Sequence, residues 1–325
     1  MSVPSAGPEG LSNVGGSLSR IAVVGSGAVG AYYGARLAHR GEDVSFLVRS
    51  DREIVRDHGW TIRVTADPAE EFVVRPVKAF RHTREMGPVD LVIVALKATS
   101  NDLLPSLLPP LLHEKTAILT LQNGLGSDEW IAARFGPERV LGGLCFVCLN
   151  RTAPGVVECY HRGSMVIGEC GRLAGPRVQA IVAAFREAGV ECAAADNLLS
   201  ARWHKLVWNV PFNGLSIAGG GVTTDRILAS ETLAAEAGAL MREVQAAAAA
   251  FGVIIPDAFL ARQIEVTRPM GACKPSSLVD FLAGRAVEVE AIWGEPLRRA
   301  QSAGVKTPRL AALHDRLGRI CLQSG

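Results

Sequence analysis

The sequence has 325 residues, 48% of them hydrophobic and 20% charged, which is enough chain for two domains with sizeable cores. Its net charge is only +2, so electrostatics give no reason to expect a nucleic-acid partner or an anionic membrane surface. No apolar run reaches the ~18 residues that a membrane span requires, so we expect no membrane association either.

Residues 1–19 are rich in Gly, Ser and Pro and lack the basic start and apolar middle of a signal peptide. We expect a flexible leader outside the fold. The seven cysteines are an odd number and are scattered, which favours a reducing compartment and a cytoplasmic protein. Cys145 and Cys148 form a CxxC, but they fall in a strand-like run that would point them to opposite faces. We therefore expect no metal site.

A glycine-rich turn follows the first apolar run. Residues 21–24 are typical of a buried strand, residues 28–40 of a helix, and Gly-x-Gly-x-x-Gly joins them. This context favours a dinucleotide site over a plain glycine turn, because the glycines permit a tight turn and a close approach of pyrophosphate to the helix N-terminus. The predicted cofactor residues in this turn are Gly25, Ser26, Gly27, Ala28, Val29 and Gly30.

The tip of the second strand, residues 43–49, is where the adenine ribose is read in such folds. The first polar side chain there is Arg49, and an arginine suits a 2′-phosphate, which favours NADP(H) over NAD. Asp51 is the alternative, because a carboxylate would accept a hydrogen bond from the 2′-hydroxyl if the strand ended later.

Two short strands are predicted at residues 61–65 and 72–77, and a central parallel strand at 89–96. Lys97 follows that central strand, at the end where open α/β sheets bind ligands. It is either a contact to cofactor or substrate or a solvated loop lysine. Asn123 follows the next strand, 116–121, within Gln-Asn-Gly, and its amide could bind a ligand oxygen, form the turn, or do both.

The remaining sheet is predicted from an antiparallel pair, residues 140–149 and 156–167, then a helix at 175–189 and a last strand at 190–194. After residue 195 the pattern is helical, with helices at 231–251 and 288–303. The prediction is a Rossmann-type α/β domain at residues 20–195 and an all-α domain at 196–325. The apolar helices of the second domain could form a homodimer surface or could be core.

The most unusual stretch of the second domain places Lys205, Asn209 and Asn213 at intervals of four. On a helix these three side chains share one face, among apolar neighbours. Buried polar groups need partners, so the face is either a binding site or a partly exposed helix with an extended lysine. Pro211 should kink this helix.

A final set of polar residues, Ser276, Asp280 and Glu288, follows in order. Together with the glycine turn, the Gln122-Asn123-Gly124 turn and the lysine helix, it resembles the ketopantoate reductase family over roughly residues 20–310. Val287, where the family often has Thr, and the Gly219–Gly221 run depart from the family pattern.

The resemblance implies NADPH-dependent reduction of 2-dehydropantoate to (R)-pantoate, on the route to pantothenate and coenzyme A. It implies that Lys205 is the general acid and that Glu288 contacts this lysine and the substrate. It implies that substrate is bound by Asn123, Asn209, Asn213 and Ser276, and that Arg49, Lys97 and Asn123 join the glycine turn in binding NADP(H). A reductase of a different small 2-keto acid and a non-catalytic NADP-sensing module are the alternatives.

Overall fold

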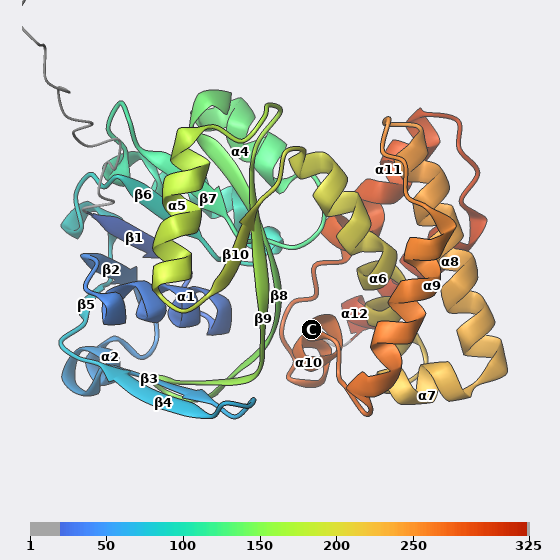
Figure 1. Ribbon diagram of the computed structural model, residues 1–325, viewed down its shortest axis with the longest axis horizontal. Helices are drawn as coiled ribbons and strands as arrows, with labels where there is room; N and C mark the ends of the chain where they lie inside the picture. The colour runs from blue at the N-terminus through green and yellow to red at the C-terminus, as the bar shows by residue number, and fades with distance from the viewer. Residues whose placement is uncertain (1–19, 324–325) are drawn as a thin grey trace, which may run out of the picture.

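The computed structural model describes residues 20–323, so the predicted leader at residues 1–19 lies outside the described part of the chain. Two halves are evident in Figure 1: a sheet with flanking helices, and a group of helices alone. The last strand ends at Ala194 and the first long helix of the other half begins at Leu198. No helix among the described residues is long and apolar enough to cross a membrane.

In the described residues one mixed sheet is formed, in the order β4-β3-β9-β8-β7-β6-β1-β2-β5, with β10 also paired to β9. All neighbours are parallel except the pairs β3–β4 and β8–β9. The strands are β1 (Ile21–Val24), β2 (Val44–Leu47), β3 (Trp60–Val64), β4 (Glu70–Val74), β5 (Lys78–Phe80), β6 (Leu91–Val94), β7 (Ala117–Thr120), β8 (Val140–Ala153), β9 (Val156–Glu169) and β10 (Glu191–Ala194).

Helices cover both faces of this sheet, which gives the Rossmann-type half that the sequence predicts. The fully buried β1 shows why its sequence is continuously apolar: Ile21 and Val23 enter one core, and Ala22 and Val24 the other. The helices and 3₁₀ turns of this half are α1 (Ala28–Arg40), α2 (Arg52–His58), η1 (Thr83–Glu85), η2 (Ala98–Leu103), α3 (Leu104–Leu107), η3 (Pro109–Leu111), α4 (Ser127–Phe135), η4 (Pro137–Arg139) and α5 (Pro176–Glu187).

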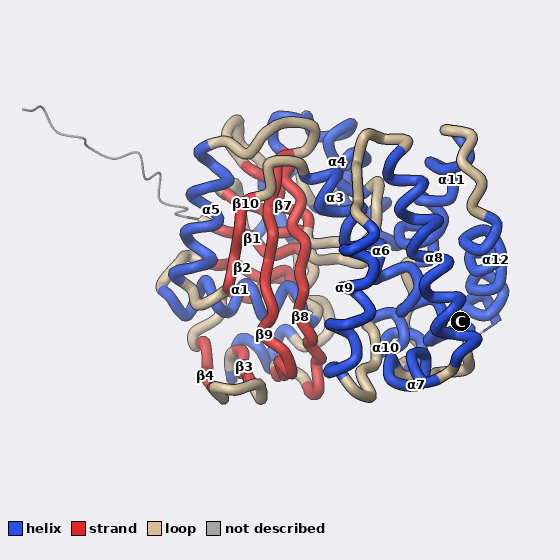
Figure 2. The backbone as a smooth tube through the Cα atoms, turned by 45° about the vertical axis from the view of Figure 1, so that its right-hand side comes forward, coloured by secondary structure: helices blue, strands red, loops and turns tan. Residues whose placement is uncertain are grey.

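The second half is all-α over its described residues, as predicted, and surrounds its own core. Figure 2 shows the strands gathered on one side and these helices on the other. Its elements are α6 (Leu198–Ala218), α7 (Thr224–Ala229), α8 (Glu231–Ala249), α9 (Asp257–Thr267), η5 (Arg268–Met270), α10 (Ser276–Leu282), η6 (Glu290–Gly294, a π-helical turn), α11 (Glu295–Ser302) and α12 (Pro308–Gln323).

Several boundaries differ from the sequence prediction for identifiable reasons. β5 was not predicted, because three residues are too few to show an alternating pattern; it is held by pairing with β2. β8 continues four residues past the predicted end, because its pairing with β9 extends to the Ala153–Val156 turn. The predicted helix at 288–303 is divided into the π-helical turn and α11, which begins with Pro296 in its first turn.

Candidate active site

The glycine turn between β1 and α1 has the space and the free donors that a pyrophosphate requires. A Cβ on Gly27 would meet no atom within 4 Å, whereas one on Gly30 would lie 2.1 Å from the Gly25 carbonyl oxygen. Gly25 has φ +105°, a conformation that favours glycine. No side chain caps the start of α1, at Ala28 and Val29, so its first N–H groups remain for a ligand. These residues fit a dinucleotide.

At the tip of β2 the two candidate ribose contacts, Arg49 and Asp51, have different surroundings. The Arg49 side chain is exposed to solvent, so a ligand can reach it. Asp51 instead forms an ion pair with Arg151, a residue of β8 that the sequence did not single out. Ser26 orders this region as well, since its hydroxyl donates to the Leu47 carbonyl at 2.7 Å.

Lys97, after β6, connects the two halves of the molecule. Its ammonium forms an ion pair with Asp280 of α10 and lies 3.9 Å from Glu288 Oε2. The next backbone N–H, of Ala98, donates to Glu288 Oε1 at 2.8 Å. The predicted cofactor residue Lys97 and the predicted catalytic residue Glu288 are therefore neighbours across the boundary between the halves.

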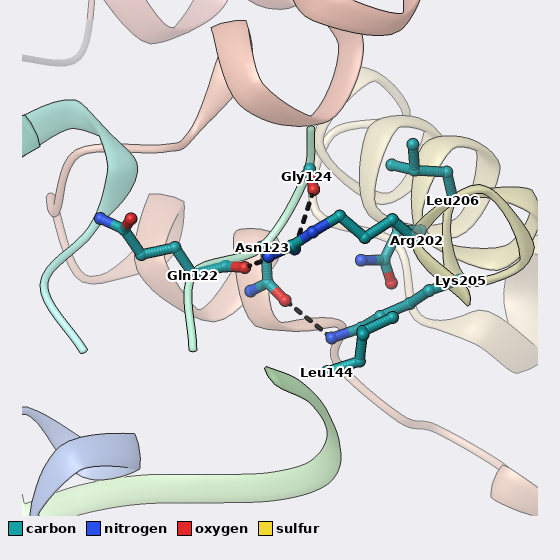
Figure 3. A pocket seen from close by; sticks show the side chains of 8 residues that line it. Gln122, Asn123, Gly124, Leu144, Arg202, Lys205 and Leu206 are labelled. Carbon is teal, nitrogen blue, oxygen red and sulfur yellow. Dashed lines mark hydrogen bonds between the residues drawn. The ribbon is translucent and has the colours of Figure 1, made fainter. Parts of the chain in front are cut away.

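Lys205 of α6 reaches from the helical half to the turn after β7 and to the interior of β8. Its Nζ donates to Asn123 Oδ1 at 2.8 Å and to the Cys145 carbonyl at 2.9 Å, and it lies 5.3 Å from the centre of the Phe146 ring (Figure 3 shows the Asn123 bond). Burial lowers the pKa of Lys205 to about 8. Lys205 as a whole is half-buried, and its ammonium exchanges a proton near pH 8.

Glu288 is almost fully buried and forms an ion pair with Lys97. Burial raises the pKa of its carboxyl, while Lys97, the Ala98 N–H and Asn123 act in the opposite direction. Among the ion pairs of residues 20–323, Glu288 pairs with Lys97 and not with Lys205.

The two asparagines on the lysine face have different surroundings. Asn209 is buried beside Lys205 and lines a cavity of about 10 Å³, room for about one water molecule. Asn213 Oδ1 accepts hydrogen bonds from the Ser277 N–H at 2.9 Å and from the Ser276 hydroxyl at 3.5 Å, which attaches the start of α10 to α6. Its buried Nδ2 has no hydrogen-bond partner in the described structure, which leaves an unsatisfied donor on the lysine face of α6.

Sequence reasoning missed a buried ion pair beneath this site. Arg202, one turn before Lys205, pairs with Asp128 at 2.9 Å and donates to the carbonyls of Gln122 and Gly124, each at 3.2 Å (Figure 3). These two carbonyls flank Asn123, so Arg202 fixes the turn that carries Asn123, the hydrogen-bond acceptor of Lys205. A charged side chain among apolar neighbours was a visible signal, but nothing in the sequence indicated Asp128 as its partner.

Comparison with known proteins gives matches to both halves of the chain. The family model described as "Ketopantoate reductase PanE/ApbA" matches residues 21–172, and its C-terminal counterpart matches residues 197–320. A 2-dehydropantoate 2-reductase from Nostoc is 38% identical over 92% of this chain and 94% of its own length. The crystal structure of a 2-dehydropantoate 2-reductase from Geobacter metallireducens superposes with a TM-score of 0.89 at 41% identity, covering 92% of this chain and 99% of its own. A D-mandelate dehydrogenase solved with NADH shares the fold alone, with a TM-score of 0.86 at 21% identity, over 94% and 99% of the two chains.

Proposed function

This chain belongs to the ketopantoate reductase family of oxidoreductases, and from that membership we propose that it reduces 2-dehydropantoate to (R)-pantoate with NADPH, on the route to pantothenate and coenzyme A. The observation that carries the proposal is the position of Lys205. The ammonium of this lysine, from the helical half, lies among residues that follow or belong to strands of the nucleotide-binding half.

The hydrogen bonds of Lys205 suit a general acid. A protonated lysine has three N–H donors, and the hydrogen bonds to Asn123 and to the Cys145 carbonyl leave one for the ketone oxygen of a substrate. After this proton is transferred, the neutral amine still has two N–H groups for the same two acceptors. The donor set therefore needs little rearrangement during the step, which favours catalysis.

NADPH, when bound at the glycine turn, supplies the hydride that reduces the ketone carbon. Residues of this chain then act on the oxygen and on the rest of the substrate. Lys205 stabilises the negative charge that develops on the oxygen and donates the proton, while Glu288 and Lys97 hold the two halves of the protein together around it. We assign substrate binding to Asn209, to the unsatisfied Nδ2 of Asn213 and to Ser276. The two asparagines share the face of α6 that carries Lys205, and Ser276 is the first residue of α10, which contacts α6.

Replacement of Lys205 tests this role. Lys205→Ala should retain NADPH binding, measured by cofactor fluorescence titration, and lose turnover of ketopantoate by ~100-fold or more. Lys205→Arg keeps the positive charge but cannot give up a proton near neutral pH, so it should be nearly as inactive. Lys115→Ala, at an exposed lysine before β7, is the matched control and should behave as the unmodified protein.

The outcomes separate the candidate functions. Near-normal turnover by Lys205→Ala would contradict the general-acid role. Faster turnover of another small 2-keto acid than of ketopantoate by the unmodified protein would favour a reductase with a different substrate. Binding of NADPH without turnover of any 2-keto acid would indicate a non-catalytic sensing module.

A further inference from the structure

Arg151, near the end of β8, joins two segments that are far apart in the sequence. Its Nη1 donates to the carbonyl oxygen of Ser26 at 3.2 Å, and its Nη2 forms an ion pair with Asp51. Its guanidinium also lies 5.3 Å from the centre of the fully buried Trp60 ring. Three independent contacts thus hold this guanidinium in one place.

That place is on the path of the adenosine half of a dinucleotide. Ser26 belongs to the glycine turn, and Asp51 precedes α2 just beyond the tip of β2. In sheets of this kind the first segment receives the pyrophosphate and the second receives the adenine ribose. A side chain bonded to both segments would therefore lie beside the adenosine half of a bound dinucleotide, between its pyrophosphate and its adenine ribose.

The charges around Asp51 show how the Arg151 guanidinium would affect the choice between NAD and NADP. An unpaired carboxylate at this tip would attract the 2′-hydroxyl of NAD and repel the 2′-phosphate of NADP. Arg151 neutralises that carboxylate. Of the other arginines nearby, Arg49 is exposed, and Arg52 directs its Nε to the Ala79 carbonyl at 3.1 Å. Arg52 also pairs with Glu53 at 3.4 Å. The three arginines still outnumber the two carboxylates, so the tip is net positive, as a phosphate dianion requires.

We propose that Arg151 is a specificity-determining residue that reads the 2′-phosphate of the adenine ribose, with Asp51 and Ser26 orienting its guanidinium before the nucleotide binds. Two contacts use part of the five N–H donors of the guanidinium, and 26% of the side chain is exposed, so an edge remains for a phosphate. The inference rests on the proposed function, because it concerns how that reductase would select NADPH over NADH.

The test measures dissociation constants for NADPH and NADH by cofactor fluorescence, with no keto acid present. Arg151→Gln should weaken NADPH binding roughly 10- to 100-fold, the scale of one charge-assisted bond to phosphate, and change NADH binding by less than about twofold. Adding Asp51→Asn to Arg151→Gln should recover at least about threefold of the NADPH affinity, because the exposed carboxylate no longer repels the phosphate. Arg151→Lys, which keeps the charge, should lose less than Arg151→Gln.

Arg162→Gln is the matched control. Arg162 lies on the neighbouring strand β9, with 29% of its side chain exposed, and pairs with Glu70 at 2.9 Å, away from the glycine turn. It should leave both dissociation constants unchanged, and thermal unfolding should verify that every variant is folded.

Equal losses for NADPH and NADH would show that Arg151 only holds the turn, and would overturn the inference. So would an Arg151→Lys variant as weak for NADPH as Arg151→Gln, or an unmodified protein without preference for NADPH. A protein that prefers NADPH in binding but reduces no 2-keto acid would instead end the proposed function and leave the role of Arg151 supported.

Discussion

The pKa of Lys205 makes the pH dependence of reduction a sensitive test of the active site. With a pKa of about 8, lowered by burial, Lys205 is protonated below that pH and neutral above it. The protonated fraction is then ~0.9 at pH ~7 and ~0.1 at pH ~9, so kcat/KM for reduction should fall about tenfold between them. An ordinary lysine would remain about 95% protonated at pH ~9, and no fall would appear.

The assay is steady-state oxidation of NADPH at subsaturating ketopantoate across this pH range, since kcat/KM reports the groups of the free enzyme. The reverse reaction, oxidation of pantoate, should show the opposite dependence and rise through the same pH, because it needs the neutral amine. A constant kcat/KM up to about pH 10 would refute the assignment of Lys205 as the acid, as would the same alkaline limb in Lys205→Arg.

Four further substitutions test the residues around the site. Gly27→Ala should leave the unfolding temperature nearly unchanged but weaken NADPH binding at least ~10-fold in a titration, because a Cβ there meets no protein atom yet occupies the space for the pyrophosphate. Gly30→Ala should instead lower the free energy of unfolding in urea by about 1–3 kcal/mol, because its Cβ would lie 2.1 Å from a backbone oxygen; equal behaviour of the two variants would contradict this distinction. Asp128→Asn leaves a buried arginine without its ion pair and should cost about 3–5 kcal/mol in the same experiment, and a loss under ~1 kcal/mol would show that the pair is not a structural support. Glu288→Gln should move the alkaline limb of kcat/KM to lower pH, since the Glu288 charge favours the protonated lysine; an unmoved limb would mean that the two groups are not coupled.

Local features of the fold were predictable because they depend on neighbours in the chain. The strand, glycine turn and helix from Ile21 to Arg40 follow from an apolar run, three glycines and helical periodicity within twenty residues, and the structure has them at those positions. The shared face of Lys205, Asn209 and Asn213 follows from the helical repeat alone, although their roles stay predictions. The short strand β5 was not predictable, because its stability comes from β2 and not from its own residues.

The amino-acid order by itself therefore determined which segments become strands and helices and which polar side chains emerge together from one helix, since both depend on repeats of a few residues. The tertiary structure decided which charges meet. Arg151 and Asp51 are 100 residues apart, Arg202 and Asp128 are 74 apart, and Glu288 meets the Ala98 N–H across 190 residues. Such pairs form where segments far apart in the sequence pack together, and no short-range pattern in the chain contains that information.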